Sequence, residues 1–251
     1  MKYTLLSEIL SEERTIRTYS WYPGRLQNKE QVTTAIYLLD GDLHYQKVLK
    51  ALQHPSLQSG QGAVLLVALG NEQSRARDYT PSAIHRGPFM SEEKAAETGG
   101  GNIFISFLEQ ELMAGVEAGF ENIQKRLIIG HSLGGLEVIN ILLKRPGLFD
   151  GYIAIEPSMW YDQKRLLRET GKVLGTGRSP KPAVFIAAAN NRSKRKLTVK
   201  PVRELIAIFN RNKNQVTFRR KYYNHFQHFT VLPAAIADGI YWMMKVAPGR
   251  S

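Results

Sequence analysis

The middle of the chain reads Gly130-His131-Ser132-Leu133-Gly134-Gly135 and joins two segments of different apolar pattern. Residues 126–129 are mostly apolar, as in a buried strand, and residues 136–143 have the apolar spacing of a helix. The pattern therefore predicts a strand, a sharp turn and a helix, with a serine at the turn.

A serine in a Gly-x-Ser-x-Gly turn of this kind is typical of the nucleophile elbow of α/β-hydrolases, where its hydroxyl is exposed above the sheet. The start of the following helix offers free N–H groups that stabilise a developing oxyanion. We expect Gly130 and Gly134 to lie where a Cβ atom would collide with the neighbouring strand or the helix start. A glycine-rich turn without chemistry is the alternative interpretation.

A length of 251 residues fits one large α/β domain better than two small ones. Together with the elbow pattern, it leads us to expect a single α/β-hydrolase domain over residues 1–251. The absence of cysteine excludes disulfides, cysteine metal sites and a thiol nucleophile. The first residues lack the sustained apolar run of a signal peptide, and no stretch is long enough to span a membrane. We therefore expect a cytoplasmic protein, or a periplasmic one if a leader precedes this sequence.

The formal net charge is +12, and the second half of the chain is rich in Lys and Arg, notably over residues 192–196 and 219–221. One interpretation is a solvated basic surface, and the other is attraction of an anionic substrate. No recognition motif accompanies the charge, so we expect no nucleic-acid partner.

Apolar runs alternate with amphipathic segments along the chain. This alternation predicts a mostly parallel central sheet with helices on both faces, and a site at the carboxyl ends of the strands. The expected strands are residues 2–10, 14–21, 33–39, 63–69, 126–129, 151–155, 182–189 and 215–223, and the expected helices are 44–52, 102–120, 136–143, 163–173, 201–210 and 233–246. The long segment 70–101 between them is expected to be functional.

A serine nucleophile needs a base, and histidine has a suitable pKa. In this fold the base follows the last strand, which leaves His225 and His228. We favour His228, because it lies nearer the start of the last helix.

The acid of the triad is less obvious. The loop after residues 182–189 begins with Asn190-Asn191 and carries no Asp or Glu. Glu156, at the end of the preceding strand, is a candidate for a shifted acid, and a Ser–His dyad is the alternative. A Glu156 carboxylate oxygen within about 3.2 Å of the His228 ring would support the triad. For the oxyanion hole, the main-chain N–H groups of Leu133 and Asp42 are the expected donors.

Several stretches, in this order, resemble the putative-esterase branch of the α/β-hydrolases. That branch contains enterochelin and salmochelin esterases, S-formylglutathione hydrolase, feruloyl esterases and mycobacterial mycolyltransferases. The similar stretches are Tyr37-Leu38-Leu39-Asp40-Gly41-Asp42-Leu43-His44, Arg77-Asp78-Tyr79-Thr80-Pro81, Thr98-Gly99-Gly100-Gly101, Gly130-His131-Ser132-Leu133-Gly134-Gly135, Pro157-Ser158-Met159-Trp160 and His228-Phe229-Thr230-Val231.

The resemblance implies Ser132 as nucleophile and His228 as base, and it supports the two oxyanion donors. Within the branch the chain looks closest to the siderophore esterases, some of which use a Ser–His dyad. Glu156 stands where the family usually has a serine.

These observations predict a serine ester hydrolase that works through an acyl-enzyme on a small-molecule ester, without a metal or cofactor. The favoured substrate is an anionic ester or lactone such as a catecholate siderophore. A general carboxylesterase and a non-catalytic binding protein are the alternatives. The candidate substrate-binding residues are Arg75, Arg77, Trp160 and Tyr161, although Arg77 also has a structural interpretation as the partner of Asp78.

Overall fold

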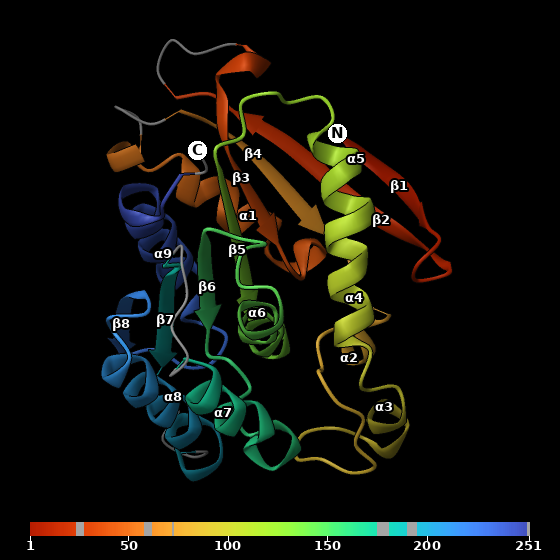
Figure 1. Cartoon of the computed structure of the whole chain (residues 1–251), viewed down its shortest axis with the longest axis vertical. Helices are drawn as coiled ribbons and strands as arrows, with labels where there is room; N and C mark the ends of the chain where they lie inside the picture. Colours follow the sequence, from red (N-terminus) through yellow and green to blue (C-terminus); the bar gives the residue numbers. More distant parts are fainter. Residues whose placement is uncertain (24–27, 58–61, 72, 175–180, 190–194, 250–251) are drawn as a thin grey trace.

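A computed structural model describes residues 1–23, 28–57, 62–71, 73–174, 181–189 and 195–249 (Figure 1). Among these residues, eight strands form one sheet in the order β1-β2-β4-β3-β5-β6-β7-β8. The strands from β3 to β8 run parallel, whereas β2 is antiparallel to both of its neighbours. The strands are β1 (Lys2–Ser7), β2 (Glu12–Trp21), β3 (Val32–Leu38), β4 (Ala63–Leu69), β5 (Lys125–His131), β6 (Gly151–Ile155), β7 (Ala183–Ala189) and β8 (Thr217–Tyr223).

Helices cover both faces of the sheet (Figure 1). On one face α1 packs against α9, and on the other lie α4, α5, α6, α7 and α8. The helices are α1 (Gly41–Leu52), α2 (Arg75–Asp78), α3 (Glu92–Ala96), α4 (Gly101–Phe107), α5 (Met113–Glu117), α6 (Leu133–Lys144), α7 (Tyr161–Val173), α8 (Lys200–Arg211) and α9 (Leu232–Val246). Short 3₁₀ turns are η1 (Lys29–Gln31) and η2 (Pro55–Leu57), and π turns are η3 (Leu108–Leu112) and η5 (Arg195–Val199). The predicted α/β-hydrolase architecture is confirmed.

The central strands are continuous apolar runs because both of their faces are covered. Every residue of β4, β6 and β7 is buried. Successive side chains of β3 enter opposite cores, with Tyr37 packed beneath α4–α6 and Leu38 packed beneath α1 and α9. The edge strands β1 and β8 are largely exposed instead. Burial on two faces therefore explains why the apolar runs located the inner strands.

Three segments differ from their predicted form. The expected helix 102–120 is a continuous run of α4, the π turn η3 and α5, which ends at Glu117 (Figure 1). Helix α7 begins at Tyr161 but contains three consecutive residues with positive φ, Asp162–Lys164. Segment 70–101 contains the short helices α2 and α3. Each departure depends on contacts with distant parts of the chain, which local apolar spacing does not encode.

Within the described ranges, no helix combines the length and the apolar character that a membrane crossing requires.

Candidate active site

Ser132 occupies the turn between β5 and α6 with φ 58° and ψ −116°, a conformation that non-glycine residues rarely adopt. The close approach of the strand to the helix enforces this turn. A Cβ atom at Gly130 would lie 2.2 Å from the carbonyl oxygen of Gly134, so the predicted collision there is confirmed.

At Gly134 the expected collision is only a tight contact, because a Cβ atom would lie 3.3 Å from Asp40 Oδ2. Gly135 is more restricted, since its Cβ would lie 3.0 Å from Pro157 Cα. The third glycine of the stretch therefore lets the helix start approach the end of β6 closely.

His228 lies in the loop between β8 and α9 and lines the same cavity as Ser132. The neighbouring His225 is exposed and does not line that cavity. In this structure the Ser132 hydroxyl lies 3.3 Å from Ser158 Oγ. The structure thus brings the favoured histidine, rather than its neighbour, to the same space as the serine.

Glu156 follows β6 with φ 46°, and this left-handed turn directs its buried carboxylate toward the base. Its Oε2 lies 3.4 Å from His228 Nδ1, slightly beyond the 3.2 Å expected for a triad hydrogen bond. Its Oε1 accepts a hydrogen bond from the Ala189 N–H at 2.5 Å. The alternative partners Asn190 and Asn191, and the basic residues up to 194, lie outside the described residues.

The cavity above Ser132 has a volume of about 590 Å³. Phe89, which has φ 62°, and Trp160 line it with rings 5.5 Å apart, and Phe229, which is 72% exposed, lines it as well. The other lining residues are Arg75, Met90, Leu133, Ser158, Thr198, Gln227 and Thr230. The sequence analysis did not predict Phe89 or Phe229 as cavity residues. Phe89 lies in the long segment 70–101, and Phe229 directly follows His228, and both facts could have indicated them.

Of the four predicted substrate-binding residues, Arg75 and Trp160 line this cavity, whereas Arg77 and Tyr161 do not. Arg77 donates hydrogen bonds to Glu12 at 2.8 and 2.9 Å and to Asp78 at 2.8 Å, as its structural interpretation predicted. Tyr161 is buried and donates its hydroxyl hydrogen to the Ser82 carbonyl at 2.7 Å. Both side chains are therefore used to hold the segments around the cavity.

Arg75 is itself anchored. Its guanidinium donates to both carboxylate oxygens of Asp40, at 2.7 and 3.0 Å, and to the carbonyl oxygen of His131 at 3.3 Å. The carboxylate is buried, so the ion pair is shielded from solvent on one side. Arg75 thus ties the start of α1 to the residue before the nucleophile.

The two predicted oxyanion donors come from two helix starts. Leu133 is the first residue of α6 and lines the cavity. Asp42 lies in the first turn of α1, where main-chain N–H groups have no acceptor within the helix. Asp42 lines a neighbouring polar cavity of about 530 Å³ rather than the one above Ser132.

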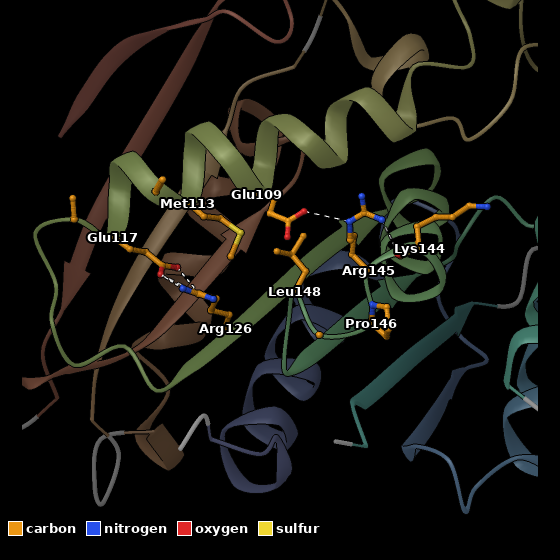
Figure 2. A pocket seen from close by; sticks show the side chains of 11 residues that line it. Glu109, Met113, Glu117, Arg126, Lys144, Arg145, Pro146 and Leu148 are labelled. Atoms are coloured by element: carbon orange, nitrogen blue, oxygen red, sulfur yellow. Dashed lines mark hydrogen bonds and ion pairs between the residues drawn. The ribbon is translucent and has the colours of Figure 1, made fainter. Parts of the chain in front are cut away.

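Another cavity of about 590 Å³ lies at the opposite end of β5 and β6 (Figure 2). Its charged side chains face one another across the opening, and Figure 2 shows the ion pairs Arg126–Glu117 and Arg145–Glu109. Lys144 lies 3.8 Å from Glu169. Because these charges are balanced locally, we assign no ligand to this cavity.

Comparison with known proteins identifies similar chains. The sequence model of the family described as "Putative esterase" matches residues 7–244. Ferri-bacillibactin esterase BesA of Bacillus subtilis is 27% identical over 223 residues, which make up 82% of this chain and 76% of the relative. Siderophore triacetylfusarinine C esterase of Aspergillus fumigatus is 28% identical over 145 residues, 53% of this chain and 47% of the relative.

Among solved structures, an IroE-like serine hydrolase from Shewanella oneidensis superimposes with a TM-score of 0.85 at 26% identity. The superposition covers 98% of this chain and 80% of the other. The similarity therefore extends over the sheet, the elbow and the loop that carries His228.

Proposed function

The chain belongs to the Putative esterase family and is an ester hydrolase, and we propose that it is a serine esterase acting on a siderophore ester or lactone. The observation that carries the proposal is the arrangement at the carboxyl end of the sheet. Ser132 sits on a left-handed turn, and His228 lines the same cavity with its Nδ1 beside the carboxylate of Glu156.

In the proposed mechanism Ser132 Oγ attacks the ester carbonyl while the His228 ring accepts the hydroxyl proton. For this step the hydroxyl, which contacts Ser158 Oγ in this structure, has to turn toward His228 across the cavity that both residues line. Glu156 orients the imidazole and stabilises its positive charge. The N–H groups of Leu133 and Asp42 bind the oxyanion. His228 then protonates the leaving alcohol, and a water molecule repeats the sequence on the acyl-enzyme.

The proposed substrate class rests on the relatives and on the cavity walls. Two relatives are esterases of bacillibactin and triacetylfusarinine C by name. The walls formed by Phe89, Trp160 and Phe229 present flat apolar surfaces suited to an aromatic group. A general carboxylesterase is the second candidate, because the only permanent positive charge among the described lining residues, Arg75, is paired with Asp40.

Two substitutions test the mechanism. Ser132→Ala and His228→Ala should each lower kcat by at least about 10³-fold, since the two residues act as one unit. The readouts are hydrolysis of p-nitrophenyl butyrate and of a catecholate trilactone, and labelling of the protein by a fluorophosphonate. Ser106→Ala, on α4, is the control. If folded Ser132→Ala protein is labelled or turns over substrate like wild type, the serine mechanism is wrong. If the wild-type protein has equal kcat/KM for the two substrates, the general carboxylesterase is favoured.

A further inference from the structure

His131 is a buried histidine that the proposed mechanism leaves without a role. It is the last residue of β5 and immediately precedes Ser132, and only 2% of its surface is exposed. Its Nε2 lies 2.9 Å from the main-chain carbonyl oxygen of His228, a residue 97 positions further along the chain. The residue beside the nucleophile therefore contacts the backbone of the proposed base.

The ring of His131 is held on several sides. The centroid of the His228 ring lies 4.5 Å away, that of Phe229 5.6 Å and that of His44 5.7 Å. These rings pack around the imidazole, and the contact between Nε2 and the His228 carbonyl oxygen sets the direction of that nitrogen. The position of the His228 carbonyl is fixed with it.

The contact between His131 Nε2 and the His228 carbonyl oxygen defines the tautomer and protonation state of His131. A carbonyl oxygen can only accept, so Nε2 must carry the hydrogen. Burial lowers the pKa of His131 well below its ordinary value, and the neighbouring His228 and His44 lower it further. The ring is therefore neutral near neutral pH, with its hydrogen on Nε2.

The loop that carries His228 needs such an anchor. Residues 224–230 are mostly exposed, and the hydrogen bonds from the N–H groups of Phe226, Gln227 and Val231 join residues within or beside the loop. Besides the packing of the His131 ring, two polar contacts from the ends of β5 and β6 reach His228 among the described residues. Glu156 contacts the ring, and His131 contacts the main chain.

We propose that His131 is a positioning residue, which fixes the main chain of His228 through its Nε2–H and thereby sets the distance between the imidazole and Ser132. The inference rests on the proposed roles of Ser132 and His228. It extends them, because the end of β5 would then carry the nucleophile Ser132 and also, through His131, hold the base His228 in place. His131 does not line the cavity, so its side chain does not contact a substrate placed there.

Two variants separate the hydrogen bond from the bulk of the side chain. His131→Leu puts an apolar side chain of similar size in its place and has no donor. His131→Gln keeps an N–H donor that extends about as far as Nε2. We expect kcat of the Leu variant to fall about 10- to 100-fold, because a misplacement of about 1 Å costs up to 100-fold in rate. KM should stay within about twofold, and the Gln variant should regain at least about a third of the loss on a logarithmic scale.

The control is His85→Leu, which removes an exposed histidine outside the cavity and should leave kcat unchanged. Melting temperatures are measured for all variants, because a purely structural role would lower the folded fraction without separating Leu from Gln. A kcat within twofold of wild type for folded Leu protein, or equal kcat for the Leu and Gln variants, would overturn the inference.

A measurement on the unaltered protein covers the case in which the Leu variant does not fold. Nitrogen NMR of histidine-labelled protein distinguishes the two neutral tautomers, and we expect the Nε2–H form for His131. The Nδ1–H form would refute the proposal. Ser132→Ala and His228→Ala are assayed alongside: if they stay active, the proposed mechanism fails, whereas if they are inactive and His131→Leu is fully active, only the positioning role fails.

Discussion

Glu156 is the residue on which the choice between a triad and a dyad depends. Its two carboxylate oxygens have different partners, the N–H of Ala189 at 2.5 Å and Nδ1 of His228 at 3.4 Å. The first contact holds the carboxylate in place, and the second allows it to stabilise an imidazolium. A neutral amide could preserve the first role but not the second.

We therefore predict that Glu156→Gln lowers kcat by about 10²- to 10⁴-fold, where the upper end is the loss caused by changing a triad carboxylate to an amide. KM should change little, because Glu156 does not line the cavity. Steady-state kinetics with a p-nitrophenyl ester measure the effect, with the exposed Glu97→Gln as control. A loss of less than about threefold in kcat would establish that Ser132 and His228 work as a dyad.

Ser132 and Glu156 could be found from the sequence because their positions are local properties. Glu156 follows an apolar run directly and Ser132 follows one after two intervening residues, and the turn at Ser132 has a glycine pattern that forces its geometry. Phe89 and Thr198 reach the cavity from segments whose paths depend on the whole fold. The contact between His131 and His228 joins the end of β5 to the loop after β8, which only the fold brings together. Spacing along the chain carries no information about such pairs.

At the scale of elements, the π turn η3 lies where the helical run meets the first hairpin. Glu111 accepts hydrogen bonds from the main-chain N–H groups of Glu8 at 2.9 Å and Ile9 at 3.0 Å, and from the hydroxyl of Ser7. One carboxylate thus caps the turn between β1 and β2. The π turn, a rare departure from regular helix form, therefore coincides with this contact.

We predict that Glu111→Gln lowers the free energy of unfolding by about 1.5–3 kcal/mol, the usual contribution of hydrogen bonds to a charged acceptor. Urea denaturation measures the change. The matched control is Glu109→Gln in the same π turn, whose exposed ion pair with Arg145 should contribute less than about 1 kcal/mol. Equal losses for the two variants would mean that the cap at Glu111 does not hold the hairpin.

The sequence predicted best those elements whose residue pattern depends only on local burial. The runs 63–69 and 151–155 coincide with β4 and β6, since strands buried on both faces are apolar throughout. The expected helix 102–120 ended three residues early and concealed the π turn. Its apolar spacing continued through Leu112 and Val116, and the signal for the π turn lay in Glu111 and a hairpin about a hundred residues earlier.

At the scale of the whole molecule, stability should depend on a carboxyl group buried in α6. Glu137 is fully buried, and burial raises its pKa well above the ordinary value of 4.5. As the pH rises above about 4.5, the unfolded chain releases this proton while the folded chain retains it. The contribution of Glu137 to stability is therefore greatest below that pH and falls as the pH rises.

We predict that Glu137→Gln removes this dependence, so that the variant gains stability relative to wild type between pH 5 and pH 8. The amide fits the site, because Asn140 Nδ2 lies 3.2 Å from both carboxylate oxygens and Asn140 Oδ1 has no partner among the described residues. Unfolding by urea at the two pH values measures the difference. A difference between variant and wild type that does not change with pH would contradict the shifted pKa.

The net charge of +12 could attract anionic substrates either by direct contact or by a long-range field of the whole molecule. A cation that touches the substrate would give a preference for anionic esters that survives high salt. Arg75 is unsuited to that role, since Asp40 already neutralises it within the described part of the cavity wall. Attraction would then come from the summed field of exposed lysines and arginines, which acts at long range and is readily screened.

We therefore predict that kcat/KM favours an anionic aromatic ester over a neutral one of equal size at low ionic strength, and that the preference disappears in concentrated salt. The screening length is about 30 Å at 0.01 M and about 3 Å at 1 M, so a long-range field vanishes over this range while a direct contact persists. Matched esters assayed at both salt concentrations separate the two cases. A preference that remains at 1 M would place a cation against the substrate. Equal values at both concentrations would leave the charge without a part in substrate choice, and the general carboxylesterase would then be the better description.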